Sequence, residues 1–524
     1  MGAGADNHDT RNYGWFALFS FLTFLLPWFI TVHQIYTIPR NRLFVAYYYS
    51  AIATPKNTYL ILSLIFGLIL AISLFVFLVK FTKTNFGGAK FHQRLRGVEM
   101  INTTRFAQLT KERKQQLTFI DVPVPSNAEN LHFGVLGSTG GGKTVGILNL
   151  IKSAIDRQAD RILCVDPNGG YLEYFYKKND VILNPFDARG SGWTIFNEIK
   201  TRFDVEQYSV SMIPKSPSTE QEAFNSMARV LVSETMLKIW ESREPESDCN
   251  AELFYWLITA PNDDLFEFLA DTPAQGLFGA SETFGSIKAV LTQYIKPHKY
   301  LTNGDFSIRA FLDNPNGGNI WITWREDQLA ALKPLISCWI DVMCAAILSM
   351  TPNNPQQKPF LLVLDEMDSL EKLNYIVQAL TKGRKHKLSV VGGIQSLAQL
   401  DDKYGKDEAL TVRNSFGSYA VCPVASLDTY TPKQMSEALG QHEVTRYQNN
   451  ISVGSGGGKG SRQLQKETEL VVTPTEITGL KSLEFYFRIA QLAYVCKNKL
   501  PYPKYPKVTT GYIEAENEWT EKRT

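Results

Sequence analysis

A glycine-rich stretch leads directly into a lysine and a threonine, and this order of residue types has a specific chemical use. The stretch consists of Gly137, Ser138, Thr139, Gly140, Gly141 and Gly142, followed by Lys143 and Thr144. In the pattern Gly-x-x-x-x-Gly-Lys-Thr, glycines allow backbone N–H groups to surround the phosphate oxygens of a nucleotide closely. Lys143 would reach the β- and γ-phosphates of ATP, and the Thr144 hydroxyl would bind the accompanying Mg²⁺.

The neighbouring residues distinguish this motif from a glycine-rich surface turn that matches by accident. Residues 133–136 are apolar enough for a buried strand, and apolar residues recur at helical spacing over 145–155. A strand, a glycine loop and a helix in this order place a helix N-terminus beneath the phosphates, where its partial positive charge favours anions. The sequence therefore predicts a nucleotide site.

Two adjacent carboxylates follow another apolar run further along the chain. Residues 360–364 are Phe-Leu-Leu-Val-Leu, and Asp365 and Glu366 come directly after them. Alone, such a run is a weak signal, because many buried strands end in acidic residues. Downstream of a phosphate loop it predicts that Asp365 binds on the Mg²⁺ side and that Glu366 orients and polarises the attacking water.

Three more polar residues are candidates for the same site. Gln395 ends the apolar segment 388–394 and could sense the γ-phosphate, although a glutamine bonded to backbone is the simpler alternative. Arg384 lies in the basic run 382–387, which could be a solvated helix end or could supply an arginine finger to a neighbouring subunit. Arg413 is the second candidate for that finger.

The elements that must position these residues read as a parallel α/β sheet. Further strand-like runs lie at 161–166, 181–183, 319–324 and 470–489. Strands that alternate with helices form parallel sheets, and these bind nucleotides at the carboxyl ends of their strands. The apolar segment 332–350 is interrupted by Lys333, Pro334 and Asp341, so we expect a packed core helix there.

Residues 197–300 differ in character from the segments on either side. Amphipathic helical patterns follow one another there without strand-like alternation, and the first begins at the cap residue Ser218 and runs to about Ser242. This pattern predicts an all-α domain inserted into the sheet domain.

The N-terminal part contains two uncharged apolar spans, at about 15–33 and 59–79. Each approaches the roughly 20 residues that cross a bilayer, whereas a core helix rarely lacks charge over that length. A cleaved signal peptide is a weaker reading, because only Arg11 precedes the first span and a second span follows. Basic residues are concentrated after the second span, which predicts a two-pass protein with both termini in the cytoplasm.

Composition adds few constraints. The 524 residues carry a net charge of +2 with 20% charged residues, so the chain is neither strongly polyanion-seeking nor disordered. Its six cysteines are scattered and predict reduced thiols rather than a zinc site or disulfides. A second glycine-rich stretch, residues 454–461, has the wrong spacing for a phosphate loop and is expected to be a flexible surface loop.

With these residues assembled, the chain resembles the coupling ATPases of conjugative type IV secretion systems, of the TrwB, TraD and TraG type. The resemblance covers nearly the whole chain. It is carried by residues 137–144, 184–189 (Asn-Pro-Phe-Asp-Ala-Arg), 364–373, 380–385, 393–396, 399–405 and 439–444.

The resemblance implies a RecA-like P-loop motor anchored in the bacterial inner membrane and assembled as a homo-hexamer. Its implied partners are single- or double-stranded DNA without sequence preference, a relaxase, and components of the secretion channel. The expected parts are a transmembrane domain (1–85), a nucleotide-binding domain (86–196 with 301–510), an all-α domain (197–300) and a tail (511–524). Alternatives are a related motor for chromosome segregation or protein-only export, or a docking hub that nucleotide merely stabilises.

Overall fold

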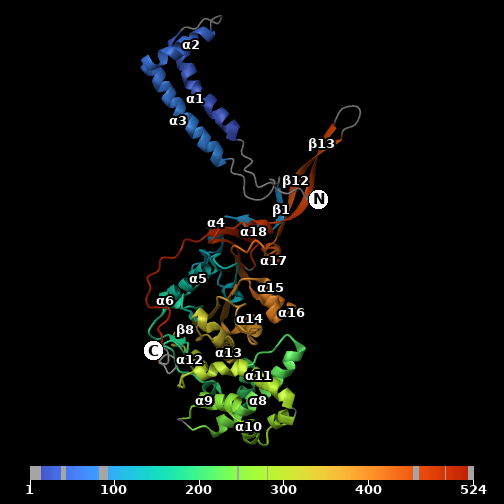
Figure 1. Cartoon of the computed structure of the whole chain (residues 1–524). Coiled ribbons are helices and arrows are strands. Elements are labelled where there is room, and N and C mark those ends of the chain that lie inside the picture. Colours follow the sequence, from blue (N-terminus) through green and yellow to red (C-terminus); the bar gives the residue numbers. More distant parts are fainter. Residues whose placement is uncertain are drawn as a thin grey trace. The chain divides into compact units, whose positions relative to one another are not determined.

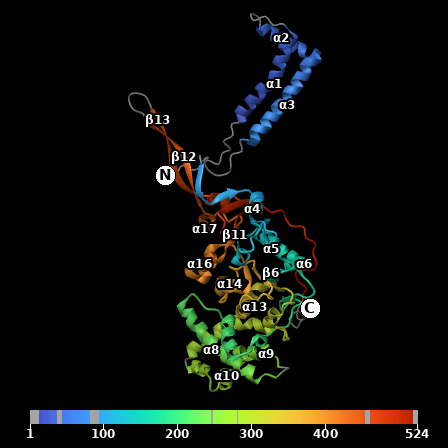
Figure 2. The ribbon, with the colours of Figure 1, turned by 180° about the vertical axis from the view of Figure 1, so that it is seen from behind.

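The computed structural model describes residues 13–36, 43–81, 93–244, 247–279, 281–452, 459–489 and 491–516. The chain folds as two compact units, Met1–Phe91 and His92–Thr524. Figure 1 and Figure 2 show the ribbon from opposite sides.

The first unit is a pair of long apolar helices joined by a short one. They are α1 (Tyr13–Ile35), α2 (Leu43–Ala53) and α3 (Thr58–Phe81), with the 3-10 turn η2 (Thr54–Lys56) before α3. Helices α1 and α3 pack closely, since a Cβ atom on Gly67 would lie 2.2 Å from the carbonyl oxygen of Phe24. Both are long and apolar enough to cross a membrane, as predicted. Helix α2 lies between the two predicted spans.

The second unit is built on a ten-stranded mixed sheet within the described residues. In spatial order its strands are β2 (Glu99–Ile101), β15 (Tyr494–Lys499), β14 (Glu484–Arg488), β11 (Ser418–Val421), β5 (Phe133–Leu136), β10 (Leu388–Ile394), β9 (Phe360–Leu364), β6 (Arg161–Pro167), β8 (Ile320–Trp324) and β7 (Val181–Leu183). The seven strands from β11 to β7 are parallel, so their carboxyl ends share one edge. The predicted parallel sheet is confirmed.

Helices cover both faces of this sheet. Successive strand residues point to opposite sides, and since they are apolar on both sides, both faces must be buried. On β9, Leu361 and Val363 face a core shared with α4 (Thr103–Thr110), α5 (Lys143–Arg157) and α6 (Leu172–Phe175). Leu362 and Leu364 face a second core, which includes α13 (Leu329–Ser349), α14 (Ile376–Lys382), α15 (Leu397–Tyr404), α16 (Lys406–Ser415), α17 (Tyr430–Leu439) and α18 (Pro474–Thr478).

Helix α13 is the third described helix that is apolar and long enough to cross a membrane. It is instead buried over most of its length, from Leu332 to Ile347, against the sheet and the helical segment. The predicted core helix is therefore confirmed.

The chain between β7 and β8 contains helices and no named strand among its described residues. They are α7 (Arg202–Met212), α8 (Thr219–Ser242), α9 (Cys249–Phe254), the π-helical turn η5 (Tyr255–Thr259), α10 (Asn262–Phe268), α11 (Ser281–Ile295) and α12 (Ile308–Asp313). Ser218 caps α8 through the backbone N–H of Gln221. Figure 1 shows α8 to α11 at the end of this unit opposite the β12–β13 hairpin. The all-helical insertion is confirmed, and its limits stay a prediction.

A three-stranded sheet lies beside the main one and consists of β1 (Gln93–Gly97), β12 (Gln441–Ser452) and β13 (Lys459–Leu470). The predicted surface loop at 454–461 is partly wrong, because Lys459 to Ser461 belong to β13 and pair with β12. Residues 453–458 lie outside the described residues. Pairing across a long antiparallel hairpin overrides the low strand propensity of glycine.

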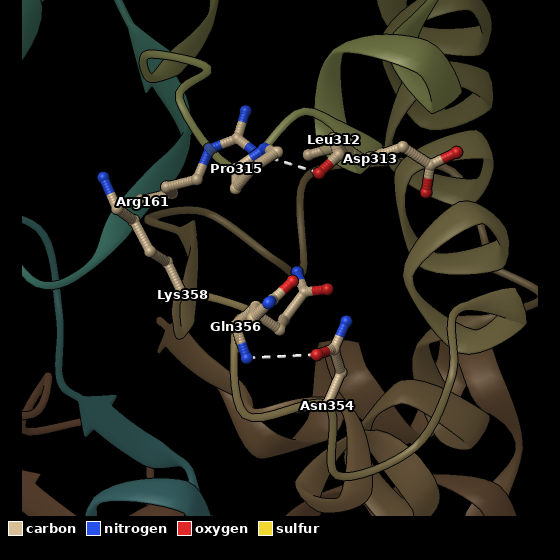
Figure 3. A pocket seen from close by; sticks show the side chains of 8 residues that line it. Arg161, Leu312, Asp313, Pro315, Asn354, Gln356 and Lys358 are labelled. Carbon is tan, nitrogen blue, oxygen red and sulfur yellow. Dashed lines mark hydrogen bonds between the residues drawn. The ribbon is translucent and has the colours of Figure 1, made fainter.

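The opposite, amino edge of the sheet holds a small pocket around Arg161 (Figure 3). The Arg161 guanidinium donates hydrogen bonds to the carbonyl oxygens of Phe311, Leu312, Asn314 and Gly318 at 2.9–3.2 Å. Burial lowers the pKa of Arg161 to about 10. This arginine thus fixes the chain that returns from the helical insertion to the sheet. All three nitrogens of its guanidinium group donate to backbone carbonyl oxygens of that segment.

Candidate nucleotide-binding site

The glycine-rich loop joins β5 to α5 at the carboxyl edge of the sheet, as its motif predicts. Neighbouring segments hold it from several sides: Gly137 N donates to Ile394 O at 3.1 Å, and Ser138 N donates to Pro423 O at 2.8 Å. A Cβ atom at Gly137 would lie 2.2 Å from the Cys422 sulfur, so only glycine fits there. Gly142 caps α5 with a φ of 111°, a left-handed conformation that glycine adopts readily.

Three of the predicted groups lie together at this edge. The Lys143 ammonium is buried within the loop and donates to Gly137 O at 2.7 Å. The Thr144 hydroxyl, in the first turn of α5, donates to Asp365 Oδ2 at 3.2 Å. Strand β9 lies two strands from β5, and its end delivers Asp365 to the loop. Residues 221 positions apart in the sequence are therefore in direct contact.

A tyrosine that the sequence analysis did not single out also contacts Asp365. The Tyr171 hydroxyl donates to the same oxygen, Asp365 Oδ2, at 2.7 Å, and the Tyr171 side chain is buried. Its position follows from Asp166 at the end of β6, whose carboxylate accepts the backbone N–H groups of Tyr171 and Leu172. Burial raises the pKa of Asp166 to about 7. The only sequence signal for this arrangement is an acidic residue at a strand end before a Pro-Asn-Gly-Gly turn.

The donor set around Asp365 fits a hard divalent cation. Asp365 Oδ1 is buried and has no hydrogen-bond partner among the described residues, so one carboxylate oxygen is left for another ligand. Together with the Thr144 hydroxyl it offers the oxygen ligands that Mg²⁺ prefers. Burial raises the pKa of Asp365, while Tyr171 and the Lys143 charge oppose that rise. A bound cation would further favour the charged carboxylate.

Glu366 and Gln395 lie side by side at the same edge. Both are partly exposed, and Gln395 Nε2 is 3.5 Å from Glu366 Oε1. The Thr139 hydroxyl of the loop is 3.4 Å from Gln395 Oε1, so Gln395 bridges the loop and the acidic residue. Burial raises the pKa of Glu366, and the neighbouring Asp365 charge adds to the rise. A carboxylate with a raised pKa is a better proton acceptor near neutral pH.

The loop that carries the two acids is held by residues of helix α15 and the end of β10. Asp368 Oδ2 accepts the backbone N–H groups of Gln395 and Ser396 at 2.9 and 3.3 Å. The Lys403 ammonium donates to Asp368 O at 2.6 Å and also bonds Leu370 O. Lys403 belongs to the motif 399–405. This motif therefore supports the acidic loop through Asp368 and Leu370, not through Glu366 itself.

The two arginine candidates lie elsewhere. Arg384 is exposed in η9 (Gly383–His386), before the amino end of β10, whereas the site lies beyond its carboxyl end. The seven residues of β10 separate them by roughly 20 Å. Arg413 is half-buried, with an ion pair to Asp401 at 3.2 Å and a hydrogen bond to the Tyr430 hydroxyl at 3.2 Å. Among the described residues, neither arginine forms a hydrogen bond or ion pair with a residue of the site.

The parallel sheet, the loop before α5, the acidic strand end of β9 and the helical insertion define a RecA-like P-loop fold with an inserted all-α domain. The family described as the type IV secretion-system coupling protein DNA-binding domain matches residues 116–501. The chain belongs to this family of coupling proteins.

Solved structures of conjugative coupling proteins have the same fold. Unbound TrwBΔN70 is 40% identical with a TM-score of 0.76, and the match covers 82% of this chain and 98% of that one. Plasmid coupling protein TrwB in complex with ADP and Mg²⁺ is 39% identical with a TM-score of 0.75, covering 82% and 100%. Nearly the whole of each solved chain is therefore matched, by about four-fifths of this one.

Curated relatives are more distant. Coupling protein TraD of Escherichia coli (strain K12) is 27% identical over 407 residues, which make up 75% of this chain and 56% of TraD. The type IV secretion system-coupling protein VirD4 of Bartonella quintana (strain Toulouse) is 33% identical over 288 residues, 50% of this chain and 43% of VirD4. This chain spans about half the length of these relatives.

Proposed function

We propose that this protein is a membrane-anchored ATPase that drives DNA transfer through a type IV secretion channel during conjugation. One observation carries the proposal: the phosphate loop, Thr144 and the buried Asp365 meet at the carboxyl edge of a parallel sheet. Family membership and the solved TrwB complexes with ADP and Mg²⁺ support the choice of nucleotide and metal.

In this proposal each residue has a defined role in hydrolysis. Lys143 and the loop N–H groups hold the phosphates, and Thr144 and Asp365 hold Mg²⁺, which neutralises phosphate charge when bound. Glu366 orients the attacking water and takes up its proton, while Gln395 senses the γ-phosphate through its contact with Glu366. Arg384 acts as a finger in a neighbouring subunit, because it is too far from the site of its own chain.

Membership of the coupling-protein family also supports a proposal for the assembly and its partners. The subunits form a homo-hexamer that binds single- or double-stranded DNA without sequence preference and receives a relaxase–DNA complex. Residues 1–85 anchor it to the bacterial inner membrane by two spans, with both termini in the cytoplasm. Residues 86–196 with 301–510 form the motor domain, residues 197–300 the all-α domain, and residues 511–524 the tail.

ATP turnover by the purified full-length protein, with and without DNA, tests this function. Lys143→Thr should lower turnover by on the order of 100-fold or more, because a charge placed on the transferring phosphate is lost. Glu366→Gln should bind ATP but not hydrolyse it, and neither variant should support DNA transfer.

The other outcomes of this experiment point elsewhere. Turnover that ignores DNA at every salt concentration would favour a motor for protein cargo, since phosphate contacts make DNA binding strongly salt-dependent. Full DNA transfer by Glu366→Gln would indicate a docking hub that only binds nucleotide.

A further inference from the structure

Helix α2 has one face packed within the first unit. The ring of Tyr47 lies edge-on to Phe29, with 5.0 Å between ring centroids, and 6.3 Å from Trp28. Ser50 is buried on the same face. The Trp28 indole N–H donates to the Thr54 hydroxyl at 2.9 Å just after the helix ends. These contacts fix which way α2 faces.

The opposite face of α2 is apolar and aromatic, and no described segment packs against it as the first unit packs against Tyr47 and Ser50. It presents Phe44, Val45, Tyr48, Tyr49 and Ile52, which follow the i, i+1, i+4, i+5, i+8 spacing of a single helix face. Phe44 is 93% exposed, and Tyr48 and Tyr49 are each 65% exposed. Helix α2 contains no charged residue. In water such a continuous apolar face would be unfavourable.

The length and the flanking residues indicate what covers this face. Eleven residues make a helix of about 16 Å, too short to cross the roughly 30 Å hydrocarbon core. Tyrosines are favoured where an apolar ring meets a wet headgroup region, and the exposed Lys56 follows the helix. In the sequence, Arg40 and Arg42 precede it. Cations on both sides of an aromatic helix suit anionic headgroups.

The surface is also continuous with the exposed apolar side chains of the two long helices. Helix α2 links the end of α1 to the start of α3, where Ile30 and Tyr59 are likewise exposed. A bilayer that surrounds α1 and α3 would therefore reach α2 without a break.

We propose that α2 is an interfacial helix whose Phe44–Ile52 face lies against phospholipid in the headgroup region. It holds the closed end of the α1–α3 pair at the surface of one leaflet. The proposal rests on the membrane anchorage proposed above.

The test measures the depth of α2 in full-length protein reconstituted in nanodiscs of phosphatidylethanolamine and phosphatidylglycerol. Tyr48→Cys and Phe44→Cys variants carry an environment-sensitive fluorophore, and the six native cysteines are all buried, which favours labelling at the new site. Quenching by lipids with a nitroxide at carbon 5 should exceed quenching by lipids with one at carbon 12 by about twofold. Phe66→Cys, in the middle of α3, should show the reverse order, and Leu427→Cys in the second unit should show neither.

The control positions distinguish failure of the interfacial helix from failure of the membrane anchorage. Unquenched labels at positions 44 and 48 with a quenched label at 66 would overturn the interfacial helix and indicate a face kept for a protein partner. Stronger quenching from carbon 12 at positions 44 and 48 would overturn it as well, because the helix would then lie in the hydrocarbon core. An unquenched label at 66 would instead overturn the membrane anchorage itself.

Discussion

One carboxylate oxygen of Asp365 accepts hydrogen bonds from two hydroxyl groups, those of Thr144 and Tyr171. Thr144 comes from the motif that defines the site, whereas Tyr171 comes from a turn whose sequence shows no catalytic pattern. A hydrogen bond to a metal-binding carboxylate fixes its orientation and tunes its affinity for the metal. If Asp365 holds Mg²⁺ as proposed, Tyr171 is a positioning residue that acts on the metal through Asp365.

Tyr171→Phe should weaken Mg²⁺ binding more than nucleotide binding. The ring remains to fill the core, but Asp365 loses one donor, so we expect the Mg²⁺ concentration at half-maximal ADP binding to rise by about tenfold. Binding of a fluorescent ADP analogue in the presence of EDTA should not change. Tyr174→Phe, in the helix α6 that begins directly after Tyr171, serves as the matched control. Equal shifts in both variants would show that the effect is structural.

Helix α13 joins the sheet to the helical insertion through a buried aspartate in its middle. The Asp341 carboxylate accepts the backbone N–H groups of Asn374 and Tyr375 and the Asn374 side-chain amide at 3.0–3.1 Å. The same Asn374 amide also donates to Val210 O at the end of α7. A single titratable group therefore supports the contact among α13, the segment before α14, and the insertion.

The stability of this contact should depend on pH. Burial raises the pKa of Asp341 from an ordinary value of 3.8 to about 7, so between these values the folded chain retains a proton that the unfolded chain releases. Its contribution to stability is present below about pH 4 and is lost as the pH rises through 7. The Tm of the Asp341→Asn variant should therefore fall less than the Tm of the wild type when the pH is raised from 5 to 8. Thermal unfolding at each pH measures this difference. Asp313→Asn, at an exposed position, is the control and should follow the wild type. Identical pH profiles of Tm for the wild type and Asp341→Asn would contradict the prediction.

The C-terminal segment 501–516, called the tail from here on, runs back along the sheet domain in Figure 1 and contacts two of its turns. The Arg189 guanidinium bonds Asp187, the Thr509 hydroxyl and Thr510 O, and Val508 N donates to Glu173 O. A Cβ atom at Gly169 would lie 2.2 Å from Gly511 O. The tail thus braces the turn that carries Tyr171, and the motif 184–189 acts as its anchor.

The proposed completion of the site by a second subunit gives a prediction for the assembled protein. Lys143→Thr and Arg384→Ala should each be inactive alone. Mixed in equal amounts they should recover about a quarter of the wild-type rate, since about one site in four then combines an intact loop with an intact finger. The measurement is ATP turnover after subunit exchange. No recovery would exclude Arg384 as a finger, and recovery with Arg413→Ala subunits instead would transfer that role to Arg413.

Local patterns along the chain were enough to predict the elements that short-range physics specifies. The spacing of glycines, lysine and threonine predicted the phosphate loop, and apolar residues at helical spacing predicted α5. The alternation of helices with apolar strands predicted the parallel sheet. The absence of charge predicted α1 and α3, and interruption by Lys333, Pro334 and Asp341 separated the core helix α13 from them. The carboxylates Asp365 and Glu366 were predicted because they end an apolar run downstream of the phosphate loop.

Contacts between segments that no local pattern links became visible in the folded chain alone. Tyr171 became a partner of Asp365 because Asp166 turns the chain after β6, and Lys403 reached the acidic loop because α15 packs on the same face. Residues 459–461 joined β13 because pairing along the hairpin outweighs the low strand propensity of glycine. Local spacing specifies which residues can perform chemistry, whereas long-range packing specifies which neighbours hold them in place.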